Sequence, residues 1–304
     1  MHPSDQNEPG IRRRRRGRGF SYSYPDGRPV RDPATLNRIK ALAVPPAWKD
    51  VWICRSADGH LQAAGTDAAG RRQYRYHDEW RAQQDRLKFD KVLEMAERLP
   101  AFRKRVQEHL ETKGLTRQRV LAAAARLLDV GFFRVGGEEY ESYGLATLRM
   151  EHVSCVNGSV VFCYPAKGDI PREVEVSDRD ACRVIRSLKA RCREGELLRY
   201  KDENGWTDVR SAEINAYVRE TLGCEATAKD FRTWHGTVLA AVGLASTPNV
   251  PEVMRQVADY LGNTPTVARA SYVDPRVIEA FERGRTIDTG GDVESAVIDL
   301  IRAV

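Results

Sequence analysis

Four separated segments of the chain carry side chains whose types suit chemistry on a phosphate ester. They contain Arg134, Lys167, Arg232, and the pair Asn263 and Tyr272. A guanidinium is permanently charged and can bond a phosphate bidentately, and an ammonium can give a proton to a departing oxygen. An amide can donate a hydrogen bond, and a phenol is a latent nucleophile. Each residue alone is more often a solvated or packing side chain, so the set has to be considered together.

In their order along the chain, these segments resemble the catalytic domain of type IB topoisomerases, of the compact kind found in poxviruses and bacteria. The likeness rests on residues 131–136 with 143–148, on the hairpin tip with Lys167, on residues 229–237, and on residues 261–265 with 271–275. It includes a nine-residue step from Asn263 to Tyr272 and covers most of the chain. Residues 70–76 (Gly-Arg-Arg-Gln-Tyr-Arg-Tyr) are similar to a DNA-contacting strand of these enzymes. The resemblance implies relaxation of supercoiled duplex DNA by transient cleavage and resealing of one strand.

The resemblance also implies a role for each candidate residue. Tyr272 would attack a phosphodiester and form a 3′-phosphotyrosyl ester, which the freed 5′-hydroxyl later reverses. Arg134 and Arg232 would clamp the phosphate, and Lys167 would protonate the leaving 5′-oxygen. Asn263 stands where many family members have a histidine. Its amide can donate the same hydrogen bond but cannot carry a charge.

This chemistry requires no metal and no nucleotide. A phenol has a reference pKa of about 10 and is a weak nucleophile at neutral pH. One charge pair at about 4 Å contributes roughly 4 kcal/mol at an effective dielectric near 20, and a positioned acid accelerates departure of the oxygen by about 10²–10⁴-fold. The ester conserves the bond energy, so no cofactor is expected. The sequence has no G-x-x-x-x-G-K-[ST] loop and no acidic cluster suited to Mg²⁺.

Further DNA contacts are expected outside the four segments. Strand alternation places two tyrosines of residues 70–76 on one face and Arg75 on the other. A glutamine amide can reach a base edge, and an arginine or a tyrosine hydroxyl can bond a phosphate. The predicted DNA-binding residues are Arg71, Gln73, Tyr74, Tyr76 and Tyr140.

The elements that must position these residues change character along the chain. Short strands are expected at 51–54, 60–64 and 71–76, with Asp58-Gly59 as a hairpin signal. Helical periodicity begins at Asp78, with Pro100 as a break, and Thr116 is expected to cap a helix. A hairpin over 160–164 and 172–176 carries Lys167 at its tip, and helices are expected at about 177–190, 211–222, 227–243, 250–261 and 290–303.

The expected fold class is therefore α+β, with a small β-rich N-terminal domain and a mainly helical catalytic domain that contains a small β-hairpin or sheet. The predicted divisions are a disordered basic tail over 1–18, a β-rich DNA-clamp domain over 19–90 and the catalytic domain over 91–304. The tail is expected because Arg12 to Arg16 form an unbroken basic run that repels itself. It is interpreted either as a nonspecific phosphate-gripping arm or as a solvated tail.

Composition bounds the class of protein. The chain has 304 residues, 41% hydrophobic and 30% charged, with a net charge of +6. No apolar run is long enough to span a membrane and no signal peptide is visible, so a cytoplasmic, nucleoid-associated protein is expected. The six cysteines show no C-x-x-C pair and are expected to be reduced thiols. The expected partner is duplex DNA, clamped by a monomer that needs no protein partner, and no metal site is expected.

Two other functions compete with this interpretation. A tyrosine site-specific recombinase resembles the same catalytic domain, but such enzymes usually present His-x-x-Arg, whereas this chain has the reverse order from Arg232 to His235. A noncatalytic DNA-binding protein with a degenerate site is the second alternative, and the intact set of candidate residues argues against it. His235 itself is expected to be a packing or supporting residue, on the same helical face as Arg232.

Overall fold

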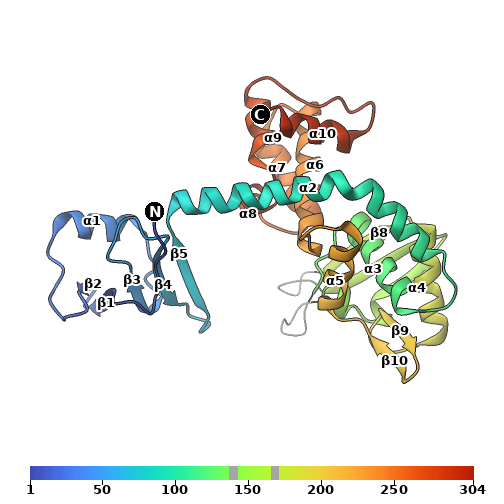
Figure 1. Ribbon diagram of the computed structural model, residues 1–304, viewed down its shortest axis with the longest axis horizontal. Coiled ribbons are helices and arrows are strands. Elements are labelled where there is room, and N and C mark those ends of the chain that lie inside the picture. Colours follow the sequence, from blue (N-terminus) through green and yellow to red (C-terminus); the bar gives the residue numbers. More distant parts are fainter. Residues whose placement is uncertain (137–142, 166–170) are drawn as a thin grey trace. The chain divides into compact units, whose positions relative to one another are not determined.

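The computed structural model describes residues 1–136, 143–165 and 171–304, which form two compact units, Met1–Lys88 and Phe89–Val304 (Figure 1). The boundary falls inside helix α2 (Asp78–Leu110). It lies close to the division expected at residues 90 and 91. Antiparallel sheets and helices are both present, which confirms the α+β class.

The Met1–Lys88 unit is built on an antiparallel sheet of five strands in the order β2-β1-β3-β4-β5 (Figure 1). Helix α1 (Pro33–Ala41) begins at Asp32, whose carboxylate accepts from the Thr35 amide, and packs Ile39 against one face of the sheet. The expected strands at 51–54, 60–64 and 71–76 are confirmed. The strands are β1 (Ile11–Arg16), β2 (Gly19–Ser23), β3 (Lys49–Ile53), β4 (Leu61–Thr66) and β5 (Arg72–Tyr76).

The disordered tail expected over residues 1–18 was wrong, because this segment is part of the sheet. The arginine run forms β1, which pairs with both β2 and β3. Ile11 is fully buried, and the guanidinium of Arg13 donates to three main-chain carbonyls and lies 4.2 Å from the centre of the Phe20 ring. Strand alternation separates neighbouring arginines onto opposite faces, so the self-repulsion that predicted disorder is reduced.

The Phe89–Val304 unit is mainly helical, with two small sheets. The sheet β6-β7-β8 and the hairpin β9-β10 are antiparallel. The helices are the remainder of α2, α3 (Arg117–Gly131), α4 (Arg179–Arg191), α5 (Ser211–Leu222), α6 (Ala228–Ser246), α7 (Val250–Leu261), α8 (Pro265–Tyr272), α9 (Pro275–Glu282) and α10 (Val293–Arg302). The strands are β6 (Val153–Val156), β7 (Ser159–Pro165), β8 (Pro171–Val176), β9 (Arg199–Asp202) and β10 (Gly205–Asp208), and two 3₁₀ turns cover Leu145–Thr147 and Met150–His152.

Most of the longer helices follow the sequence prediction. Thr116 caps α3 by accepting from the Arg119 amide, and the five predicted helices correspond to α4, α5, α6, α7 and α10. The break expected at Pro100 was wrong, because α2 continues through it to Leu110. Proline removes one helical hydrogen bond, but Leu99, Phe102 and Val106 are buried on either side of it and hold the helix together.

The C-terminal helix α10 is held to the unit by a partly buried ion-pair network. Arg103 on α2 bonds both oxygens of Asp129 on α3, at 2.8 and 2.9 Å, and also both oxygens of Glu294 on α10. The indole of Trp234 on α6 donates to Glu294 at 2.8 Å. Burial alone would raise the pKa of Glu294, but the bonds from Arg103 and Trp234 lower it below its usual value. The carboxylate therefore stays charged and ties α10 to α2 and α6.

All six cysteines are free thiols, in line with the reduced state expected. None of the helices among the described residues is both long enough and apolar enough to cross a bilayer.

We expect Glu294→Ala to lower the free energy of unfolding by about 2 kcal/mol. The substitution removes the carboxylate that accepts hydrogen bonds from the Arg103 guanidinium and the Trp234 indole. The matched control is Glu279→Ala, whose pair with Arg283 is 47% and 52% exposed. The control should change stability by less than about 0.5 kcal/mol. Urea unfolding measures both, and equal losses would contradict a structural role for the network.

Candidate active site

The C-terminal end of α7 organises the candidate site. The helix ends at Gly262, which adopts the left-handed conformation with φ 62°. The last carbonyls of a helix have no partner within it and carry the negative end of the helix dipole. The turn favours glycine, and a Cβ at Gly262 would also come within 2.5 Å of Nη1 of Arg172, so the tip of that side chain would have to shift.

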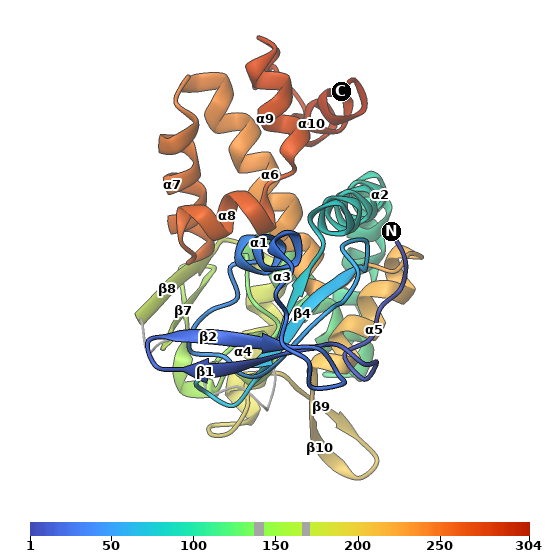
Figure 2. The ribbon, with the colours of Figure 1, turned by 90° about the vertical axis from the view of Figure 1, so that its left-hand side faces the viewer.

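Three arginines from three different elements each bond one of these consecutive carbonyls. Arg172 on β8 donates to Tyr260 O at 3.1 Å, Arg232 on α6 donates to Leu261 O at 2.6 Å, and Arg134 donates to Gly262 O at 3.0 Å. Figure 2 shows β8 close to the end of α7. Three guanidiniums from distant parts of the sequence are thereby gathered within one helical turn of main chain.

Arg232 is the most constrained of the three, since only 2% of the residue is exposed. It also donates to the carbonyl of Phe132, which ends α3 in a left-handed conformation with φ 58°. This conformation is uncommon for a residue other than glycine. Burial lowers the pKa of Arg232 to about 10, and repulsion from Arg134 acts in the same direction. The group therefore remains charged at neutral pH although it is buried.

Tyr272 is brought to this cluster by the short helix α8. Thr264 caps that helix by accepting from the Val267 amide, and Pro265 starts it, so the chain turns back immediately after Asn263. The Tyr272 ring lies with its centre 5.4 Å from Cζ of Arg232. Its main-chain oxygen packs on α6, where a Cβ at Gly236 would come within 2.6 Å of it. The position of Tyr272 thus depends on a glycine one helical turn after Arg232.

Among the described residues, no carboxylate balances the charges of the three guanidiniums. Within residues 1–136, 143–165 and 171–304, none of Arg134, Arg172 and Arg232 forms a salt bridge. The positive charges of all three arginines act on the Tyr164 hydroxyl. Burial raises the pKa of this hydroxyl, and the three arginines oppose that increase. The site is therefore cationic and suited to an anionic ligand.

The structure brings together four of the five residues predicted to be catalytic: Arg134, Arg232, Asn263 and Tyr272. Asn263 accepts from Arg134 through Oδ1 at 2.9 Å, which orients its amide. Lys167, the fifth, and Tyr140 lie outside the described residues. The predicted hairpin that carries Lys167 is confirmed as β7 and β8, whose last described pair is Pro165 with Pro171.

Two residues of the site were not identified from the sequence. Arg172 shares a strand face with Val174 and Val176, so an arginine on the apolar face of a strand was the available signal. Gly236 is a glycine inside a helix, which costs about 1 kcal/mol relative to alanine and therefore indicates a close approach. His235 packs its ring against Phe132 at 4.5 Å, and burial lowers its pKa, so it supports the carbonyl that holds Arg232.

The predicted DNA-contacting residues of the first unit gather around β5. Asp67, in the turn before this strand, pairs with Arg71 at 3.1 Å and accepts from the Gln73 amide at 3.0 Å. The Tyr74 and Tyr76 rings lie 6.1 Å apart, and Tyr76 stacks on Trp80 at 4.4 Å. As predicted, register places Tyr74 and Arg75 on opposite faces of the strand.

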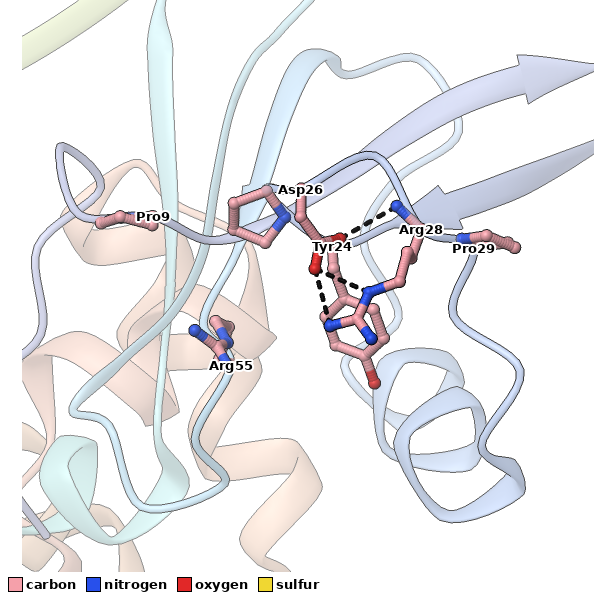
Figure 3. Close-up of a pocket in the computed structure, with 7 residues that line it drawn as sticks. Pro9, Tyr24, Asp26, Arg28, Pro29 and Arg55 are labelled. Atoms are coloured by element: carbon pink, nitrogen blue, oxygen red, sulfur yellow. Dashed lines mark hydrogen bonds and ion pairs between the residues drawn. The ribbon is translucent and has the colours of Figure 1, made fainter.

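A surface pocket in the same unit lies away from β5. It is lined by Pro9, Tyr24, Pro25, Asp26, Arg28, Pro29 and Arg55, and Figure 3 shows the Asp26 carboxylate bonded to the main chain and guanidinium of Arg28. None of the predicted site residues lines it, and its one carboxylate, Asp26, is already paired with Arg28.

Comparison with known proteins agrees with this arrangement. Residues 77–280 match the family described as eukaryotic DNA topoisomerase I, catalytic core, and residues 19–67 match the bacterial DNA topoisomerase IB N-terminal domain. The chain is also 28% identical, over 299 residues, to DNA topoisomerase 1B of Acanthamoeba polyphaga mimivirus, an alignment that covers 90% of this chain and 88% of that protein. The chain belongs to the type IB DNA topoisomerase family.

We expect Gly236→Ala to slow covalent attachment to DNA by at least about tenfold. The added Cβ displaces the main chain of Tyr272, the nucleophile predicted from the sequence, and small misplacements of a reacting group are costly. Noncovalent duplex affinity should change little. The matched control is Gly243→Ala on the same helix, where the Cβ would meet only Val253 side-chain atoms. Both variants disturb packing, so equal rates of adduct formation by the two would show that Gly236 does not position Tyr272.

Proposed function

We propose that this topoisomerase relaxes supercoiled duplex DNA through a transient 3′-phosphotyrosyl bond to Tyr272. The observation that carries this assignment is the group of three guanidiniums at the end of α7, uncompensated by carboxylates among the described residues. One of them, Arg232, has its Cζ 5.4 Å from the centre of the Tyr272 ring. A phosphodiester gains negative charge on its nonbridging oxygens during attack, and preformed cations stabilise that charge most effectively.

The proposed first step exchanges one ester for another. The Tyr272 oxygen passes its proton to solvent water and bonds to phosphorus, and the bond from phosphorus to the 5′-oxygen breaks. The departing oxygen takes a proton and leaves as a 5′-hydroxyl. We assign that proton to Lys167 on the family resemblance, since this residue lies outside the described residues. Swivelling of the nicked duplex releases torsion, and attack by the 5′-hydroxyl on the phosphotyrosyl ester restores the strand.

The carbonyls of α7 hold the arginines without using all of their donors. A guanidinium has five N–H groups, and the hydrogen bonds that Arg134 and Arg172 make to described residues each use one nitrogen, Nη2. Arg232 has a buried Nε without an acceptor among the described residues. Buried donors are normally paired, so a phosphate oxygen would satisfy this one. The arginines can therefore bind phosphate while they stay anchored.

Asn263 fits a donor role in this scheme. Arg134 donates to its amide oxygen, and the amide nitrogen donates to Leu261 O at 3.5 Å. The second N–H of the NH₂ group is left for another acceptor. We propose that it bonds a nonbridging phosphate oxygen, the role of the histidine that many family members have there. An amide has no proton to exchange near neutral pH, so it takes no part in acid–base steps.

The Met1–Lys88 unit supplies contacts away from the reacting phosphate. We propose that Tyr74 and Arg71 bond phosphates, that Tyr76 supports Tyr74 by stacking, and that Gln73 reads a base edge. Asp67 preorders Arg71 and Gln73 in this scheme. Tyr140, outside the described residues, is proposed to bond a phosphate beside the scissile one. We further propose that a monomer does this without a protein partner.

Tyr272→Phe should abolish both the covalent protein–DNA adduct and plasmid relaxation, because the attacking oxygen is removed, while duplex binding is retained. The measurement is relaxation of supercoiled plasmid in EDTA without ATP, with adducts trapped by denaturant. Tyr260→Phe is the control, since this tyrosine is 53% exposed and lies on α7 near the same cluster. Relaxation by the Tyr272 variant would refute the assignment of the nucleophile.

Arg172→Gln should slow single-turnover cleavage by about 10- to 100-fold, in the range found when one charge-stabilising donor is removed. The reason is loss of one of three cations at the phosphate, so Arg172→Lys should recover part of the rate. Arg179→Gln, at the exposed start of α4, is the control and should leave the rate unchanged. If glutamine and lysine at position 172 behave alike, the charge of Arg172 has no role.

A further inference from the structure

The strand β1 presents a row of exposed arginines on one face of the five-stranded sheet. Arg12, Arg14 and Arg16 are all exposed, and the residues paired with them on β2 are Ser23, Ser21 and Gly19. These partners are too small to cover a guanidinium. The opposite face of the same strand carries Ile11, Arg13 and Arg15, and Arg13 is anchored there by three carbonyls.

The register of the sheet places this row on the face that carries Tyr74. Arg12 pairs with Trp52, Trp52 with Ala64, and Ala64 with Tyr74. Directly opposed residues of neighbouring strands point to the same side. The middle of the face is covered by the N-terminal residues, since Trp52 donates to Glu8 O and Ser4 bonds Leu61. The arginine row and Tyr74, which is 43% exposed, lie on either side of that cover.

Among the described residues, no carboxylate neutralises the positive charges of Arg12, Arg14 and Arg16. Among the described residues, the side chains of Arg12, Arg14 and Arg16 have neither a salt bridge nor a hydrogen bond, and no carboxylate stands opposite them in the register. The three aligned cations stabilise no contact among the described residues, yet strand pairing holds β1 in place and keeps them in line. Charge complementarity therefore indicates a polyanion.

We propose that the Arg12, Arg14 and Arg16 row binds the sugar–phosphate backbone of the duplex on which the enzyme acts, as a second DNA contact of the unit beside that of β5. This inference rests on the proposed function. The residues matched to known families begin at position 19, so β1 precedes them.

The dimensions of the sheet agree with this partner. Alternate residues of a strand are about 7 Å apart, so the row spans about 13 Å, the axial rise of roughly four phosphates of one DNA strand. The row and β5 are separated by three strand spacings, about 14 Å, which is close to the major-groove width of about 12 Å. One duplex can therefore offer a phosphate strand to each side of the sheet face.

The test is the salt dependence of noncovalent duplex binding, measured with Tyr272→Phe chains so that no adduct forms. Arg12, Arg14 and Arg16 are changed together to Gln. Each lost phosphate contact reduces the slope of log K against log salt by about 0.9, so a reduction of about 2 to 3 and a loss of affinity of about tenfold or more are expected. The same three positions changed to Lys should keep the slope within about 0.5 of the parent.

The matched control removes three cations from the opposite side: Arg15→Gln, Arg31→Gln and Lys40→Gln, the last on α1, which packs on that face. Its slope should change by less than about 1. Equal changes for the two glutamine sets, an unchanged slope for the Arg12 set, or a lysine set as weak as the glutamine set would each overturn the proposal. Formation of the covalent adduct is measured separately with Tyr272 intact. Absence of that adduct would show that the proposed function fails, independently of the salt dependence of the arginine row.

Discussion

The structure depends on the interaction between the C-terminal carbonyls of α7 and three guanidiniums. A helix end exposes carbonyls without partners and a partial negative charge. Arg134, Arg172 and Arg232 satisfy these carbonyls one each, and so three elements of the fold are tied to one point. Because the acceptors are neutral carbonyls rather than carboxylates, the arginines are positioned while their positive charge remains available to a ligand.

Burial of Arg232 shows what this arrangement costs and what it provides. Removing a guanidinium from water is unfavourable, and burial lowers its pKa to about 10. The carbonyls of Phe132 and Leu261 offset part of that cost. In return, a fixed cation that is itself buried lies beside the Tyr272 ring, and a buried charge has a larger effect on a developing negative charge than an exposed one. Gly236 and the left-handed Phe132 are consequences of the same close packing.

The β-rich unit handles positive charge in the opposite way. Its arginines on β1 are kept exposed and in line by strand pairing, and only Arg13 is turned inward to bond carbonyls. The turn that reverses the chain after Arg16 is made possible by Gly17, whose φ of 58° suits the first central position of a two-residue hairpin. The five consecutive arginines, which repel one another in an extended tail, are thus divided between the two faces of a sheet.

The sequence by itself determined the local elements and the identity of the central side chains. The cap at Thr116, apolar periodicity, and the order of Arg134, Arg232, Asn263 and Tyr272 are encoded within short windows, so they could be predicted. Only the tertiary structure decided that Arg172 joins the cluster, that Gly236 must lack a side chain, and that β1 is ordered. These features depend on contacts between residues far apart in the chain, such as Arg134 with Gly262 across 128 positions, and no local pattern specifies which distant carbonyl a guanidinium will meet.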